Sequence, residues 1–257
     1  THGFITNVGK AHLEGFGGVE GVIKGKSEMY AFLSEHNKYV FVNLDDAIQK
    51  EKTAKNLRIT FSHTDKNASV FINKIEANPF VAIEFDGIKI KSHLIGLYNA
   101  NNINAAITIG RYFKISDDEI KEAIESYVPE NNRSQLLLKN SNEIILDAYN
   151  ANPSSMEVAI KNFLQLDKEN KVAVLGELGE ESLREHKHIV ALLKHEKEVQ
   201  TYFVGKDFYE NKNDTENLHF FKTYDEFAQA FKAEKIENKT LLIKGSRGMA
   251  LERTLEL

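Results

Sequence analysis

The second half of the chain alternates short apolar runs with helical segments, and this alternation constrains the fold more than any other feature. After a first apolar run at 143–146, the pattern predicts helices at 153–166, 181–196, 224–233 and 248–257 and strands at 172–175, 201–204, 219–222 and 240–243. Strands that alternate with helices predict a parallel sheet covered on both faces. We therefore expect a parallel α/β domain here.

The first half predicts a mixed α/β domain. Short apolar runs predict strands at 4–8, 39–43 and 58–62, and helical spacing predicts helices at 47–55, 100–112 and 116–127. From Ser69 to Leu94 apolar and polar residues alternate around an Asp86-Gly87 turn, which is typical of a hairpin and predicts an antiparallel β insertion. The polar segment Pro129–Asn132 predicts a linker. We accordingly expect two domains, residues 1–130 and 131–257.

Composition excludes several classes of protein. A net charge of −5 and a pI near 6.0 argue against a general nucleic-acid binder. The chain has no cysteine, so it forms no disulfide and no cysteine metal site, which is compatible with a reducing cytosol. No apolar run approaches the roughly 18–20 residues of a membrane span. We expect no membrane insertion, and the opening Thr1 without Met suggests a fragment.

Polar side chains crowd the segment that follows the strand predicted at 143–146. Asp147, Tyr149, Asn150 and Asn152 precede Pro153, which suits the first turn of a helix. In an open α/β fold, ligands bind at such strand-to-helix turns, where free N–H groups attract phosphates or carboxylates. The alternative is a capped turn in which Asn152 is the N-cap.

Two segments near the start of the chain suggest metal or phosphate chemistry. His12 lies in a Gly-rich polar loop with Asn7 and Glu14, and these side chains could hold Mg²⁺, although a lone histidine in a loop is commonly a bystander. The Gly25-Lys26-Ser27 run lacks the glycine spacing of a phosphate-binding loop, so we reject that interpretation.

Further polar groups appear at three places. Asn99 and Asn102 share a helix face, where carboxamides could contact adenine or could simply cap the helix. Arg133 follows the linker and could clamp a phosphate or form a surface ion pair. Residues 244–248, Lys-Gly-Ser-Arg-Gly, read as an anion site at a helix N-terminus. Residues 180–186 are interpreted as a solvated charged face.

Three of these segments resemble the Mur ligase family, the ATP-dependent amide-forming ligases of peptidoglycan synthesis. Residues 5–17 match the pattern ITN-G-AHLEGFG, residues 147–153 match DxYNANP, and residues 244–247 match a terminal KGSR. Within the family they are most similar to the type that adds D-alanyl-D-alanine to UDP-N-acetylmuramoyl-tripeptide. The resemblance implies the rest of a central ATPase domain, which lacks its phosphate loop, followed by a complete Rossmann-like C-terminal domain. We expect such a fragment to fold but to have little or no ligase activity alone.

The resemblance also implies a cytoplasmic bacterial monomer and roles for particular residues, with ATP and Mg²⁺ as cofactors. His12 and Lys26 would be the catalytic Mg²⁺ ligands, Lys26 as a carbamate, with Lys24 as the nearby competitor. The nucleotide contacts would come from Asn102 with Asn99 for adenine, Arg133 for phosphate, Asp147 for ribose, and Tyr149 and Asn150 beside them. The substrate contacts would come from Asn152 and, for the carboxylate of the incoming dipeptide, from Lys244, Ser246 and Arg247.

Three positions depart from the family pattern. Tyr98 stands where the family usually has histidine, Leu146 replaces the first aspartate of a common pair, and the loop at 176–179 is about three residues short, which puts substrate contacts near Glu177 in doubt. The alternatives are another Mur or folylpolyglutamate-type amide ligase, or a non-catalytic binding module that retains the fold.

Overall fold

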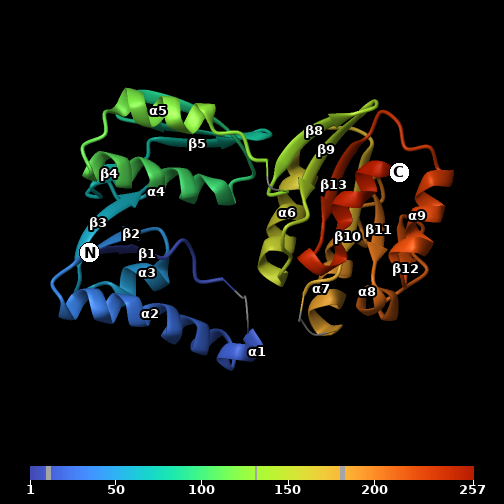
Figure 1. The fold of residues 1–257 in the computed structure, drawn as a ribbon, viewed down its shortest axis with the longest axis horizontal. Coiled ribbons are helices and arrows are strands. Elements are labelled where there is room, and N and C mark those ends of the chain that lie inside the picture. The colour runs from blue at the N-terminus through green and yellow to red at the C-terminus, as the bar shows by residue number, and fades with distance from the viewer. Residues whose placement is uncertain (10–12, 131, 180–182) are drawn as a thin grey trace. The chain divides into compact units, whose positions relative to one another are not determined.

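The computed structural model describes residues 1–9, 13–130, 132–179 and 183–257 and divides into two compact units. Unit 1 is Thr1–Val128 and unit 2 is Pro129–Leu257 (Figure 1). The division lies two residues before the boundary predicted at 130 and directly precedes the polar segment 129–132. Each unit has its own hydrophobic core and is described by itself.

Unit 1 contains a parallel sheet in the order β1-β2-β3-β4. Its strands are β1 (His2–Phe4), β2 (Tyr39–Asn43), β3 (Leu57–Ser62) and β4 (Val70–Phe71). Two strand predictions were wrong in detail. The strand predicted at 4–8 pairs with β2 only from His2 to Phe4. The first run of the predicted antiparallel insertion, β4, pairs in parallel with β3, and its buried Val70 packs in the core that both sheets of unit 1 share.

The helices of unit 1 begin with α1 (Leu13–Phe16), α2 (Val19–Glu35) and α3 (Ala47–Lys52). Helix α2, which the sequence analysis did not predict, buries Val22, Tyr30 and Leu33. Asp46 caps α3 by accepting hydrogen bonds from the backbone N–H groups of residues 48 and 49.

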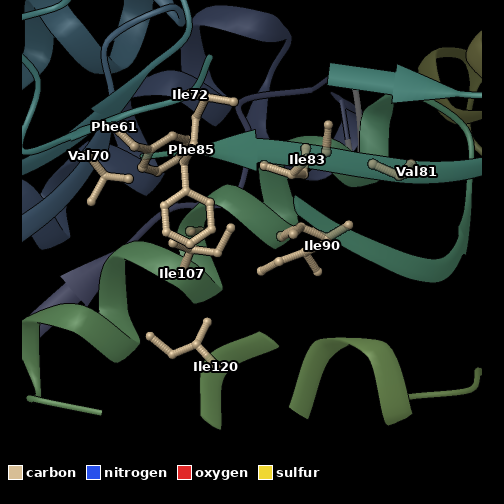
Figure 2. Close-up of a cluster of buried hydrophobic side chains, with 12 residues drawn as sticks. Phe61, Val70, Ile72, Val81, Ile83, Phe85, Ile90, Ile107 and Ile120 are labelled. Carbon is tan, nitrogen blue, oxygen red and sulfur yellow. The ribbon is translucent and has the colours of Figure 1, made fainter. Parts of the chain in front are cut away.

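A three-stranded antiparallel sheet completes unit 1 with two more helices. The sheet contains β5 (Lys74–Ala77), β6 (Phe80–Phe85) and β7 (Ile88–Ile95), and the helices are α4 (Tyr98–Tyr112) and α5 (Asp117–Ser126). The predicted Asp86-Gly87 turn is confirmed, with both residues at positive φ. The predicted capping box of Ser116 and Glu119 opens α5. Side chains from both sheets and both helices meet in one core (Figure 2).

Unit 2 is built on a six-stranded sheet in the order β12-β11-β10-β13-β9-β8. The strands are β8 (Gln135–Lys139), β9 (Asn142–Asp147), β10 (Lys171–Gly176), β11 (Gln200–Val204), β12 (Leu218–Phe221) and β13 (Thr240–Lys244). Five strands are parallel, as predicted, whereas the edge strand β8 is antiparallel to β9 and was not predicted. The two strands form a hairpin through residues 140 and 141.

Helices cover both faces of the unit 2 sheet, as the alternation predicted. They are α6 (Pro153–Gln165), α7 (Leu183–Leu193), α8 (Lys206–Glu210) and α9 (Tyr224–Ala233). Phe227 and Phe231 of α9 pack with Leu251 against alternate residues of the central strands, while α7 lies between α6 and α8. No helix in the described part of the chain is long and apolar enough to cross a membrane.

The end of the chain differs from the prediction. Instead of one α-helix over 248–257, two 3₁₀ helices occur, η1 (Arg247–Met249) and η2 (Leu251–Glu256). Ala250 lies between them in the left-handed conformation, with φ at 47°, which breaks helical continuity. Leu251 is fully buried in the core, so the turn is fixed by packing of the residue that follows it.

Candidate functional site

The end of β9 and the end of β13 bring two opposite charges together at the carboxyl edge of the unit 2 sheet. The two strands are parallel neighbours, and Lys244 is directly paired with Asp147. The Lys244 Nζ atom lies 2.6 Å from Asp147 Oδ2 and also donates to the carbonyl oxygen of Asn150 at 3.0 Å. The side chain of Lys244 is only 2% exposed and that of Asp147 is 15% exposed.

This geometry corrects the role predicted for Lys244. The sequence analysis assigned its ammonium to the carboxylate of an incoming ligand. In the structure the ammonium is buried, and acceptors of the protein itself, on Asp147 and Asn150, use two of its three donors. A buried charge must be paired in this way because desolvation is costly. Lys244 therefore organises the turn at 147–150 and is not presented to solvent.

The segment directly after the linker is attached to the same turn. The backbone N–H of Ser134 donates to Asp147 Oδ1 at 3.2 Å, and the N–H of Tyr149 donates to the carbonyl oxygen of Asn132 at 3.2 Å. The guanidinium of Arg133 lies 3.8 Å from the centre of the Tyr149 ring, a cation–π contact. The structure therefore places the predicted residues Arg133, Asp147 and Tyr149 in one cluster.

Two of these groups face solvent. Arg133 is exposed and the ring of Tyr149 is 42% exposed, so a cation and an aromatic face are accessible side by side. Asn150, the next residue of the turn, is also exposed. Because phosphates suit guanidinium groups and bases suit aromatic faces, the cluster has the chemistry of a site for an anion that carries an aromatic ring.

Asn152 is the N-cap of α6, as the alternative interpretation of this segment expected. Its side-chain oxygen accepts from the backbone N–H of Ser155 at 2.9 Å, and Ser155 Oγ accepts from the N–H of Asn152 at 3.1 Å. Pro153 is the first residue of α6, as predicted. The Asn152 oxygen is thus occupied by the helix, which removes half of the carboxamide from ligand binding.

Ser246 and Arg247 lie in a different setting from the one predicted. The anion-site interpretation placed them at the N-terminus of an α-helix, but η1 has only three residues. Ser246 is half-buried, and its N–H donates to the Glu177 carbonyl oxygen at 3.0 Å. Arg247 is 63% exposed and its Nη1 donates to Glu252 Oε1 at 3.0 Å. Only the exposed guanidinium of Arg247 therefore remains as an accessible cation here.

The two asparagines predicted for adenine differ in accessibility. Asn99 is 8% exposed; its Nδ2 donates to the Ile95 carbonyl oxygen at 2.8 Å, and its Oδ1 accepts from Asn102 Nδ2 at 3.1 Å. Asn102 is exposed. Asn99 therefore holds the start of α4 and orients Asn102, and only Asn102 presents a carboxamide edge to solvent.

The predicted metal ligands are placed only in part. His12 lies outside the described residues. Lys26, on α2, is half-buried and its Nζ donates to the carbonyl oxygen of Asn7 at 3.0 Å, whereas its competitor Lys24 is exposed. Within residues 1–9, 13–130, 132–179 and 183–257, no three His, Cys, Asp or Glu side chains gather into a metal-binding group.

Comparison with known proteins identifies the family. The Mur ligase middle domain model matches residues 1–110, and the model of the Mur ligase glutamate ligase domain matches residues 132–247. The chain belongs to the Mur ligase family.

Individual Mur ligases match nearly the whole chain. The UDP-N-acetylmuramoyl-tripeptide–D-alanyl-D-alanine ligase of Borreliella burgdorferi is 27% identical over 98% of this chain and 57% of its own length. A MurF crystal structure from Acinetobacter baumannii gives a TM-score of 0.82 at 25% identity and covers 99% of this chain and 58% of that chain. The MurF ligase of Thermotoga maritima in complex with ADP gives a TM-score of 0.81 at 22% identity, covering 99% and 60%, and supports the fold alone. The chain thus spans under two thirds of the length of these relatives.

Within this Mur ligase chain, the sequence analysis missed two further ordered polar clusters. Of residues 180–186, which were interpreted as a solvated charged face, 180–182 lie outside the described residues and Leu183 and Arg184 are exposed. His186 departs from that interpretation, because it is fully buried and its Nε2 accepts from the N–H of Leu178 at 3.2 Å. Glu177 Oε1 accepts from the N–H of Asp207 at the start of α8 at 2.9 Å. The short loop at 176–179 of this Mur ligase is therefore held from two sides. The sequence signal that could have predicted this buried side chain is a histidine in the first turn of an amphipathic helix.

The second missed cluster lies where β2 and β3 end. Asp45 accepts hydrogen bonds from the hydroxyls of Ser62 and Thr64 at 2.5 and 2.6 Å, and from the N–H and Nδ1 of His63 at 2.8 and 2.6 Å. Burial raises the pKa of the Asp45 carboxyl, but these hydrogen bonds outweigh burial and lower its pKa to about 2. The available signal was an aspartate directly after a buried strand.

Proposed function

We propose that this chain is the nucleotide-binding and acceptor-binding part of an ATP-dependent amide ligase of peptidoglycan synthesis. The reaction would join D-alanyl-D-alanine to UDP-N-acetylmuramoyl-tripeptide. The observation that carries the proposal is the extent of the match. A UDP-N-acetylmuramoyl-tripeptide–D-alanyl-D-alanine ligase aligns with 98% of this chain, across both units.

The proposed reaction has two steps. The γ-phosphoryl group of ATP passes to the terminal carboxylate of the tripeptide, which gives ADP and an acyl phosphate. The amine of D-alanyl-D-alanine then attacks the acyl carbon, the C–O bond to phosphate breaks, and the products are an amide, inorganic phosphate and a proton. Positioning and charge stabilisation dominate such phosphoryl transfers.

In this proposal the cluster on the 147–150 turn binds the nucleotide. Arg133 is an exposed guanidinium that suits a phosphate, and it lies over the Tyr149 ring. Asp147 is held by Lys244 and by the Ser134 N–H, so the carboxylate is preorganised toward a ribose hydroxyl. Asn102, which belongs to unit 1, is exposed and oriented by Asn99, and its carboxamide has the donor and acceptor pair that suits an adenine edge.

The acceptor dipeptide carries a carboxylate that needs a cation. Lys244 is excluded from this role because it is buried in its own ion pair. Arg247 is the remaining candidate of the three residues predicted, since its guanidinium is mostly exposed and makes one hydrogen bond with Glu252. A bidentate carboxylate contact would use the fork of that guanidinium.

Mg²⁺ is proposed as the metal, with a restriction that comes from donor chemistry. Lys26 is held beside the loop that follows β1, but an ammonium that donates to a carbonyl is no metal ligand. The ligand set fits Mg²⁺ only if Lys26 is carbamylated, because a carbamate supplies the oxygen that Mg²⁺ prefers. With His12 as the second ligand, the ion would neutralise phosphate charge when bound.

The test is an acceptor-specific ligase assay on the protein encoded by the gene from which this chain comes. The protein is incubated with ATP and UDP-N-acetylmuramoyl-tripeptide, and products are identified by mass spectrometry. We expect a pentapeptide product with D-alanyl-D-alanine and none with glutamate or diaminopimelate as the acceptor. Product with one of those amino acids would support another ligase of the family, and no ATP turnover would support a binding module. The 257 residues alone should give little or no product.

A further inference from the structure

The Lys244–Asp147 pair does more than neutralise two charges, because it holds the segment that follows the linker. The Asp147 carboxylate accepts from Lys244 Nζ through Oδ2 and from the Ser134 N–H through Oδ1. Its two oxygens therefore connect a buried central strand with residue 134. Ser134 itself is only 4% exposed, so this N–H is removed from water and depends on its protein acceptor.

The segment 132–134 has a backbone that requires such support. Asn132 and Ser134 both adopt positive φ, 55° and 51°, a conformation that costs non-glycine residues about 1 kcal/mol or more each. The carbonyl oxygen of Asn132 is held by the Tyr149 N–H, and the N–H of Ser134 by Asp147. Arg133, between them, is thus fastened on both sides to the turn at 147–149, and its guanidinium lies on the Tyr149 ring.

Lys244 also fixes the turn at residues 147–150. Its second hydrogen bond, to the Asn150 carbonyl oxygen, is made three residues beyond Asp147. One buried ammonium therefore sets both the carboxylate that holds residue 134 and the backbone of the turn that holds residue 132. Without it, Asp147 would lose its charge partner and turn toward water, since the carboxylate is already partly accessible.

We infer that Lys244 is a positioning residue for nucleotide binding, which acts through Asp147 to hold Arg133 in place and does not itself contact a ligand. The inference deepens the proposed function and rests on it for the identity of the ligand. The class of ligand is a nucleoside diphosphate or triphosphate, because the group held in place is an exposed guanidinium over an aromatic face.

The first test needs no ligand. Amide hydrogen exchange is measured by NMR in the 257-residue chain and in the variant Lys244→Met, which keeps an unbranched side chain one atom shorter and removes the charge. We expect exchange at Ser134 to accelerate about tenfold more than exchange at Val174 in the core of β10, because Val174 reports only the overall stability of unit 2, whereas Ser134 also loses the support of its own hydrogen bond. Equal acceleration at both amides, or none at Ser134, would overturn the inference.

Two further variants separate positioning from general stability. Lys171→Met is the matched control, since Lys171 lies on neighbouring β10 and its Nζ donates to the Leu164 carbonyl oxygen at 2.7 Å at the opposite edge of the sheet. It should leave exchange at Ser134 unchanged. If Lys244→Met does not fold, the double variant Asp147→Asn, Lys244→Met removes the unpaired charge while an amide oxygen can still accept from Ser134. This double variant should restore the slow exchange.

The second test measures ADP affinity by NMR titration. We expect Lys244→Met to weaken ADP binding about tenfold, and expect the added effect of Arg133→Ala to be much smaller in that variant than in the wild type. Independent, multiplicative effects of the two substitutions would overturn the inference. If the wild-type chain does not bind ADP, the proposed nucleotide site is wrong, and the exchange experiment still decides whether Lys244 positions residues 132–134.

Discussion

Removing Asp147 should destabilise unit 2 more than any single change to an exposed ion pair. In Asp147→Ala the ammonium of Lys244, 2% exposed, keeps only the Asn150 carbonyl oxygen as a partner. Breaking a buried pair by deleting one partner costs about 3–5 kcal/mol, since the other charge stays buried without compensation. Lys244→Met should cost less, about 2–3 kcal/mol, because Asp147 is closer to water and keeps the Ser134 N–H.

The double variant gives the sharper test of this reasoning. With both charges removed, no unpaired ion remains, and the cost of Asp147→Ala, Lys244→Met should fall to about 1–2 kcal/mol. The coupling between the two substitutions is then about 3 kcal/mol or more, far above the value of an exposed pair. Lys161 and Glu157 supply the control: their atoms lie 2.5 Å apart, but the side chains are 58% and 31% exposed, so the same cycle should give about 0.5 kcal/mol or less.

The assay is urea unfolding of the four proteins in each cycle. Because the chain has no tryptophan, unfolding is followed by circular dichroism and by NMR signals of buried β13 residues such as Ile243, which report unit 2 specifically. A cost below about 1 kcal/mol for Asp147→Ala, or additive effects in the cycle, would refute the claim that the pair is buried and mutually dependent.

Other predictions concern single residues. The Asp45 carboxyl has a folded pKa of about 2, below its ordinary value, so its stabilisation is present above about pH 4 and is lost as pH falls toward 2. Because solvent screens this partly buried carboxylate, Asp45→Asn should cost only about 1 kcal/mol in urea unfolding at pH 7, and a difference that persists unchanged at pH 2.5 would contradict this. Asn102→Ala should weaken ADP binding in an NMR titration while changing the unfolding free energy by less than about 0.5 kcal/mol, because the side chain is exposed; a stability loss without a binding loss would mean that it is structural. Asn152→Ala removes the cap of α6 and should lower the unfolding free energy by about 1 kcal/mol, measured by thermal unfolding. An unchanged unfolding free energy would mean that Asn152 does not cap the helix. With ¹³C-bicarbonate, a carbamate NMR signal should disappear in Lys26→Ala and remain in Lys24→Ala; the reverse would reassign the modified lysine.

Periodicity and capping rules predicted most of the fold, because local sequence determines those features. Alternating apolar runs were enough for the parallel sheet of unit 2, and Asn152 before Pro153 was enough for the start of α6. Strand β8 was missed because three leucines form too short a run, although a local two-residue turn at residues 140 and 141 pairs it with β9. The final α-helix was wrongly predicted because the left-handed Ala250 is fixed by burial of Leu251 and not by local preference.

The candidate site was predictable in composition but not in role. The sequence named Arg133, Asp147, Tyr149 and Lys244, and the structure brings them together. A lysine at a strand end can face solvent or a neighbouring strand, and only the register of β13 against β9 shows that Lys244 faces Asp147. Residue type therefore identified the charges, whereas the pairing that changes Lys244 from a ligand contact to an internal one depends on tertiary structure.

The most direct test of the account is to map ADP binding onto the chain by NMR. We expect added ADP to shift the amide signals of residues 133, 134 and 147–150 together, in one saturable transition, and Arg133→Ala to abolish these shifts while the fold is retained. Saturable shifts confined to other parts of unit 2, or shifts at the turn that persist in Arg133→Ala, would contradict the claim that this turn and the segment attached to it form the nucleotide site.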